Sequence, residues 1–366
     1  MVTVNEETSK RITSLRFLLM LFVMIKHNAI VKDIFMHELP FYEPSAITFI
    51  KEFFANGLGE LAVPVFFFFS GFLLASSDDK YLTILKKRFR SIFIPYSLWT
   101  VLYFAGWLAF RKLGFNHETP VDGWSEWSLY DYIVRFAGYY NGYIFTFVGS
   151  FWFLRDLMIL IVLSPIIMFL CRKFPVLILF VFGISWFFLQ SLIIILPVSI
   201  FFFSLGIICC LYKIDLFKIA DSLSWSEILL LYFFNYLFYK SHMTYNANGG
   251  IHHSFWFFAF VFSGIFGLLK LSSVIVNNEK AFSLSKNLSV FTFFTYAFHT
   301  PILLEIVKRI TFRITAVQIY GGAIRSLAQF VLACILDIGI SLAVGIILLR
   351  ICPPLFSLFS GGKRIK

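Results

Sequence analysis

Long runs of apolar residues recur along the whole chain and are separated by short polar segments. A run of about 20 apolar residues can cross the hydrocarbon core of a bilayer as a helix. The pattern predicts about ten such helices, which we place at residues 15–36, 58–76, 91–110, 150–170, 174–190, 192–212, 226–241, 254–271, 288–307 and 327–351. We therefore expect an all-α, polytopic integral membrane protein.

The amino-acid composition also indicates a membrane environment. Hydrophobic residues make up 59% of the 366 residues and charged residues only 14%, which is more apolar surface than one aqueous core can bury. No low-complexity linker or internal repeat divides the chain. We expect one transmembrane domain over residues 1–366, in a cell (inner or plasma) membrane and without a separate soluble domain.

The positive charges indicate an orientation. Cytoplasmic loops of membrane proteins carry an excess of Lys and Arg. An even number of spans with both termini in the cytoplasm places the larger share of the 31 Lys and Arg residues inside, including the segments KKRFR and CRK. This predicts an N-in and C-in topology, and it explains the net charge of +11 without nucleic acid as a partner.

The cysteines and histidines give no sign of a metal. The five cysteines lie in or beside apolar runs without CxxC spacing, which is typical of small core residues. His242, His252 and His253 stand in one polar segment, but their spacing is irregular and no cysteine is near. We expect no metal site.

One histidine lies unusually deep in a predicted span. In RFLLMLFVMIKHN, Arg16 and His27 are eleven residues apart, which is close to three helical turns, so they share a face about 16 Å apart along the axis. An ionisable residue at membrane depth is costly and commonly functional. The plainer interpretations are a histidine bonded to a neighbouring helix and one that marks the outer boundary of a short span.

Two further segments carry polar or small residues in a conspicuous place. The run VPVFFFFSGFLLAS contains Ser70 and Gly71, which let another backbone approach closely or break the helix around a cavity. The segment KKRFRSIFIPYSLW contains Lys87, Arg88 and Arg90 just before a predicted span. These cations form either a positive-inside anchor or an anion site.

Two later predicted spans also contain polar residues within an apolar run. FWFLRDLM contains Trp152 and the adjacent Arg155 and Asp156, which as sequence neighbours do not face each other on a helix and need partners elsewhere. TYAFHTP contains Tyr296 and His299, three residues apart and so on one face.

These five motifs, in this order, resemble the membrane-bound acyltransferase family 3. The resemblance covers nearly the whole chain: the arginine and histidine eleven residues apart, VPVFFFFSGFLL, RFRSIFIPYSLW, FWFLRDL and TYAFHTP. It implies transfer of an acyl group, usually acetyl, from cytosolic acyl-CoA to a hydroxyl of a cell-envelope carbohydrate. The implied partners are acyl-CoA, a carbohydrate acceptor and the bilayer. The donor is a substrate, and we expect no tightly bound cofactor.

The residues fit roles in that reaction. A sugar hydroxyl is a poor nucleophile and needs a general base, for which the ordinary pKa of histidine suits His27. Guanidinium and ammonium groups bind phosphate oxygens, so Arg16, Lys87, Arg88 and Arg90 are the expected sites for the CoA phosphates. We expect Ser70, Gly71, Trp152, Arg155, Asp156, Tyr296 and His299 to support the pocket.

Two points of the site stay open in the sequence. Many family members have two arginines three residues apart, whereas this chain has Arg88 and Arg90. The carboxylate that orients His27 is Glu60, Asp156 or Asp337, with no spacing that selects one.

Two alternatives concern the acceptor and the function class. The aromatic residues of segment 111–149 suit stacking on sugar rings or an aromatic belt at the headgroups. A transporter or flippase of a lipid-linked sugar also uses intramembrane charges and broken helices. Release of free CoA thiol distinguishes the transferase, because transport alone releases none.

Overall fold

A computed structural model describes residues 5–29, 45–112, 121, 123–140, 143–144, 146, 148–189, 192, 194–245, 255–318 and 322–362. His252 and His253 lie outside these residues, and only the backbone is described at His242. The regular elements of the described residues are helices, apart from one two-stranded antiparallel pair, β1 (Tyr139–Tyr140) and β2 (Tyr143–Ile144). The all-α prediction is confirmed at this level.

The chain divides into two compact units. Of the described residues, the first unit takes those within Met1–Leu19, Glu60–Leu85 and Asp156–Ser289, and the second takes the remainder. Four helices have residues in both units: α1 (Glu6–Ala29), α3 (Gly59–Ala75), α4 (Tyr81–Arg88) and α7 (Trp152–Val162).

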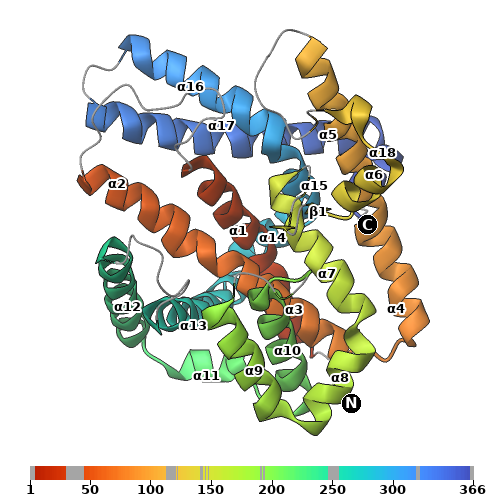
Figure 1. Cartoon of the computed structure of the whole chain (residues 1–366). Helices are drawn as coiled ribbons and strands as arrows, with labels where there is room; N and C mark the ends of the chain where they lie inside the picture. Colours follow the sequence, from red (N-terminus) through yellow and green to blue (C-terminus); the bar gives the residue numbers. More distant parts are fainter. Residues whose placement is uncertain are drawn as a thin grey trace. The chain divides into compact units, whose positions relative to one another are not determined.

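The first unit is built around a buried helix. Its other helices are α8 (Ser164–Lys173), α9 (Pro175–Phe188), α10 (Pro197–Leu211), α11 (Leu216–Ser222), α12 (Trp225–Tyr245), α13 (Phe255–Asn277) and α14 (Glu279–Leu288). Most residues of α10 are buried, with Phe202 and Phe203 fully enclosed. Helices α12 and α13 pack side by side (Figure 1).

The second unit contains the remaining elements. They are α2 (Ser45–Glu52), η1 (Phe53–Leu58), η2 (Phe89–Phe93), α5 (Ile94–Lys112), η3 (Trp124–Glu126), α6 (Leu129–Phe136), β1, β2, η4 (Gly149–Phe151), α15 (Thr292–Phe298), η5 (His299–Leu303), α16 (Leu304–Gln318), α17 (Gly322–Ile351) and α18 (Pro353–Phe359). Helices α16 and α17 lie side by side (Figure 1). Trp99 joins α5 to α15 and α18, because its ring packs on Phe294 and its indole N–H donates to the Phe359 carbonyl.

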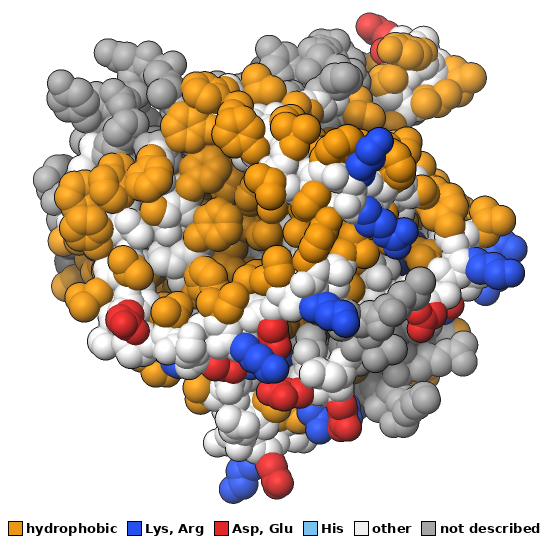
Figure 2. All heavy atoms as spheres, turned by 90° about the horizontal axis from the view of Figure 1, so that it is seen from below, with side chains coloured by type: hydrophobic (Ala, Val, Ile, Leu, Met, Phe, Trp, Pro, Cys, Tyr) orange, Lys and Arg blue, Asp and Glu red, His pale blue; other side chains and the backbone are white. Residues whose placement is uncertain are grey.

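The surface carries many large apolar side chains. Hydrophobic atoms cover much of the face in Figure 2. Among the exposed residues, Val176 on α9 and Leu230 on α12 keep 80% and 71% of their surface accessible. Water would oppose this exposure, whereas hydrocarbon does not. A multi-pass membrane protein follows from this surface together with the apolar helices.

The number of spans differs from the prediction. Each of the ten predicted segments overlaps a helix or a helix pair, and residues 30–36 of the first segment lie outside the described residues. Among the described residues, only five helices are long and apolar enough to cross a membrane alone. Three bent pairs bring this number to at most eight. The chain bends by 68° between α7 and α8, where Pro165 removes an amide from the helix, and by 92° between α10 and α11, where Lys213 has a positive φ. Hydropathy detects apolar length but not these bends.

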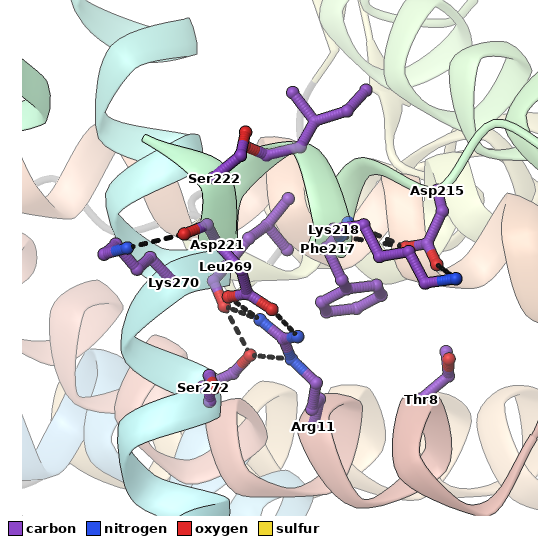
Figure 3. Close-up of polar contacts among 12 residues, drawn as sticks. Thr8, Arg11, Asp215, Phe217, Lys218, Asp221, Ser222, Leu269, Lys270 and Ser272 are labelled. Carbon is purple, nitrogen blue, oxygen red and sulfur yellow. Dashed lines mark hydrogen bonds and ion pairs between the residues drawn. The ribbon is translucent and has the colours of Figure 1, made fainter. Parts of the chain in front are cut away.

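The first helix begins earlier than its charges suggest. The predicted span starts at residue 15, whereas α1 starts at Glu6. Arg11 is buried because its guanidinium makes two bonds to the Asp221 carboxylate, at 2.6 and 2.8 Å (Figure 3). It also donates to the Ser272 hydroxyl and the Leu269 carbonyl. A charge paired in this way can lie inside a helix bundle.

The basic segment before the third predicted span is also helical. Helix α4, the π-helical turn η2 and helix α5 run without interruption from Tyr81 to Lys112. Pro95 lacks an amide to donate to the Ser91 carbonyl, and a wider turn precedes it. Lys87, Arg88 and Arg90 therefore lie on a helix.

Gly71 confirms the expectation of close backbone contact. A Cβ on Gly71 of α3 would collide with the Phe203 carbonyl of α10, and a Cβ on Gly206 of α10 would collide with the Phe68 carbonyl of α3. The two helices thus meet backbone to backbone at a pair of glycines. The Ser70 hydroxyl donates to the Phe66 carbonyl within α3.

Replacing Gly71 with alanine is expected to lower the free energy of unfolding by about 1–3 kcal/mol, because the added methyl forces α3 and α10 apart. Thermal unfolding of the protein in lipid nanodiscs measures this change. Gly339→Ala is the matched control, since a Cβ there meets nothing within 4 Å. Equal stability of Gly71→Ala and wild type would contradict the close contact.

Candidate functional site

The last turn of α1 brings two polar residues into the second unit. Asn28 is buried, and its amide donates to the Asp337 carboxylate at 2.8 Å and to the Met24 carbonyl at 3.0 Å. Asp337 is fully buried on α17. This contact ties α1 to α17 directly beside His27, which keeps part of its surface accessible.

A second histidine lies against His27. The ring centroids of His27 and His299 are 5.5 Å apart. His299 is buried, and its Nδ1 lies 2.7 Å from the Tyr296 carbonyl oxygen. A carbonyl only accepts, so Nδ1 carries the proton and Nε2 of the neutral ring is an acceptor. Nε2 has no hydrogen-bond partner among the described residues.

The chain places His299 at a break in a helix. Helix α15 ends at Phe298, and Thr300 has extended backbone angles within η5. Pro301 has no amide to serve the Ala297 carbonyl. The single O–H of Tyr103 on α5 is shared between this carbonyl and that of Phe298, with oxygen–oxygen distances of 3.0 Å each. Tyr103 therefore satisfies the carbonyls that the break leaves open.

Tyr296 connects this break to the start of α7. Its hydroxyl donates to the Ser150 carbonyl, and its ring stacks on Phe151 with centroids 5.9 Å apart. Phe153 contacts the same ring edge-on. Tyr296 and His299 therefore belong to one site, as the spacing predicts, with the phenol in a structural bond.

The adjacent residues Arg155 and Asp156 serve different units. In the second unit, Arg155 donates from Nη1 to the Gly138 carbonyl at 2.6 Å. In the first unit, the Asp156 carboxylate accepts from the Leu196 amide at 3.0 Å and from the Ser199 hydroxyl at 2.7 Å, so it caps the start of α10. The expectation of separate partners is confirmed.

Comparison with known families gives a match over nearly the whole length. The profile of an acyltransferase domain, that of acyltransferase family 3, matches residues 10–348. The chain belongs to acyltransferase family 3. A search of curated proteins found no match. No solved structure matched either.

The cations that the family resemblance selects lie on two helical segments. Lys87 and Arg88 end α4, and Arg90 follows in η2, with Lys87 and Arg90 exposed and Arg88 partly buried. Arg16 lies on α1, is partly exposed and belongs to the first unit. The three cations near residue 90 are assembled locally by one helix.

The other supporting residues divide in the same way. Trp152 starts α7 in the second unit and is partly buried. Ser70, Gly71 and Asp156 belong to the first unit. There the Ser70 hydroxyl bonds within α3, Gly71 packs against α10 and Asp156 caps the start of α10. The structure thus brings Tyr296 and His299 to His27 within one unit. Ser70, Gly71 and Asp156 instead have packing or hydrogen-bonding roles in the other unit.

Among the three carboxylates left open, Asp337 accepts a hydrogen bond from Asn28, the residue next to His27. Asp156 accepts hydrogen bonds at the start of α10. Sequence reasoning missed Asn28 and Tyr103. Asn28 had a signal, because it follows His27 in the polar end of an apolar run, but Tyr103 had none.

The described residues contain no group of three or more His, Cys, Asp or Glu side chains suited to a metal ion. Cys171, Cys209, Cys210, Cys334 and Cys352 are free thiols.

Aromatic residues of the predicted outer segment pack on one another. Trp127 stacks on the Arg135 guanidinium at 4.1 Å, and the Tyr132 hydroxyl donates to the Trp124 carbonyl. Tyr130 keeps 71% of its surface accessible. Ser128 caps α6 through bonds with Asp131, which hold the pKa of this exposed carboxyl below its usual value. The side chains of Tyr139, Tyr140 and Tyr143 lie outside the described residues.

Proposed function

We propose that this family member is an O-acyltransferase that moves an acyl group, most simply acetyl, from acyl-CoA to a hydroxyl of a carbohydrate. The observation that carries this proposal is the juxtaposition of His27 and His299 beside the bond between Asn28 and Asp337. The whole chain acts as one transmembrane domain in the inner or plasma membrane, with both termini in the cytoplasm.

His27 is the general base in this proposal. It takes the proton of the acceptor hydroxyl while the oxygen attacks the thioester carbonyl carbon. The C–S bond then breaks, and the protonated His27 gives this proton to the departing CoA thiolate, which restores the neutral imidazole. His27 suits this role because it combines a place in a buried polar cluster with accessible surface.

The donor is bound by cations in this proposal. Lys87, Arg88 and Arg90 stand close together at the junction of α4 and η2, and Arg16 stands eleven residues before His27 on α1. Their charges suit the phosphates of acyl-CoA. Acyl-CoA is consumed as a substrate, and no tightly bound cofactor takes part.

The acceptor is a carbohydrate of the cell envelope, free or linked to a lipid. The aromatic group around α6 supports this assignment, since exposed rings such as that of Tyr130 can stack on sugars. Lipid contact explains the same exposure, so the acceptor rests chiefly on the family.

Acyl transfer is tested with purified protein in nanodiscs, radiolabelled acetyl-CoA and glycan from the host envelope. We expect label in the glycan together with an equal amount of free CoA thiol. Glycan movement across a vesicle membrane without thiol release would instead support a transporter or flippase.

The double variant Arg88→Gln/Arg90→Gln is expected to bind acyl-CoA about 10- to 100-fold more weakly, because each bond to a charged group contributes about 1.5–3 kcal/mol and part of this is screened by solvent. Titration of the protein with CoA measures the change. Lys280→Gln/Lys286→Gln removes the same two charges from exposed positions on α14 and serves as control. Equal binding by both variants would remove the phosphate role of the arginines.

A further inference from the structure

The buried ring of His299 has one nitrogen with a hydrogen-bond partner and one without, among the described residues. Its Nδ1 is committed as a donor to the Tyr296 carbonyl, and its Nε2 is buried without a partner among the described residues. A buried acceptor without a partner costs about 1–3 kcal/mol. The ring 5.5 Å away is that of His27.

The distance between the His27 and His299 rings favours a bridged contact over a direct hydrogen bond. Each imidazole nitrogen lies about 1.1 Å from its ring centre, so a direct N–H···N bond of about 3 Å allows centroids at most about 5.2 Å apart. The observed 5.5 Å exceeds this limit. One oxygen atom between the rings, bonded to each nitrogen at about 2.8 Å, allows centroids up to about 7 Å apart.

The bridging group must supply a donor. Since Nε2 of His299 accepts, the oxygen donates one hydrogen to it, and the same oxygen can accept the ring N–H of His27. Water meets both demands.

We propose that a water molecule bridges His27 and His299, and that His299 thereby fixes the ring orientation and tautomer of His27. This inference rests on the proposed function, in which His27 is the base. One nitrogen of His27 donates toward His299, and the other keeps its lone pair for the acceptor hydroxyl. His299 is thus a positioning residue that fills the role for which the sequence offered three carboxylates.

Two substitutions separate this role from simple packing. His299→Asn keeps a donor in the place of Nδ1 but has no acceptor in the place of Nε2. His299→Gln places its amide oxygen where Nε2 stood. We expect kcat to fall about 10- to 100-fold in His299→Asn, the size of loss found when a partner that orients a metal-bound histidine is removed. We expect His299→Gln to recover most of that loss, with the KM for acetyl-CoA unchanged in both.

The tautomer is measured directly by 15N NMR of histidine-labelled protein in nanodiscs, with the His27 signals assigned from His27→Gln. One tautomer is expected in wild type and His299→Gln, and a mixture in His299→Asn. His242→Asn, on α12 of the first unit, is the control and should change neither kcat nor the His27 signals. If His299→Asn does not fold, the His299→Gln spectrum decides: one tautomer supports the bridge and a mixture overturns it.

Failure of this inference differs from failure of the proposed function. A wild-type kcat and one His27 tautomer in His299→Asn would overturn the bridge while acyl transfer stands. Full transfer by His27→Ala would overturn the function of His27 as base, whereas the NMR spectrum would still decide whether the two rings are coupled.

Discussion

Replacing His27 with alanine is expected to lower acyl transfer by about 100- to 10,000-fold, the usual contribution of a positioned general base. The physical reason is that His27 combines an imidazole that can accept a proton with a place beside the buried bond between Asn28 and Asp337. His299 cannot substitute, because it is buried and its Nδ1 is bonded to the Tyr296 carbonyl.

The measurement is incorporation of labelled acetyl into glycan under single-turnover conditions, which isolates the chemical step. Binding of CoA should be retained, since the proposed phosphate site consists of cations on other turns. His242→Ala, on α12, is the matched control. Transfer at the wild-type rate by His27→Ala would exclude histidine base catalysis.

Replacing Arg11 with glutamine is expected to lower the free energy of unfolding by about 3 kcal/mol, at the lower end for a buried ion pair that loses one partner. The lower end is expected because the Asp221 side chain keeps 37% of its surface accessible and can return to solvent. The Ser272 hydroxyl and the Leu269 carbonyl also lose their donor. The loss falls on the contacts that hold α1 to α11 and α13 (Figure 3).

Thermal unfolding in nanodiscs, followed by tryptophan fluorescence, measures this change. Lys10→Gln is the neighbouring control, because the Lys10 and Glu6 pair is exposed and such pairs contribute about 0–1 kcal/mol. The double variant Arg11→Met/Asp221→Leu should recover part of the loss, since it removes both charges. A stability of Arg11→Gln equal to that of Lys10→Gln would show that the buried pair contributes nothing.

Much of the fold could be predicted from local patterns in the sequence. The apolar runs predicted a helix at each of the ten positions, because a lipid-soluble helix must satisfy its own backbone and so shows itself as local apolar length. The glycine in SGF predicted close contact, and the pair in FWFLRDL predicted separate partners. Both expectations hold at Gly71 and at Arg155 and Asp156.

The helix bends and the burial of charged side chains could not be predicted from local patterns in the sequence. Arg11 reads as a boundary residue, yet it is buried inside α1 because Asp221 and Ser272 supply partners 210 and 261 positions away. Hydropathy gave ten spans where the helices support five to eight. Three of the candidates are bent pairs, helix α9 with 14 residues is too short to cross alone, and α12 is not among the candidates.

The sequence by itself determined the membrane solvent, the helical class, the family motifs and the choice of His27 and His299. Only the tertiary structure decided that these two rings are neighbours, that Asn28 bonds to Asp337 across 309 positions, and that Tyr103 serves the broken end of α15. The reason is physical: apolar length and helical period are properties of adjacent residues, whereas the partner of a buried polar group is set by which helices pack together.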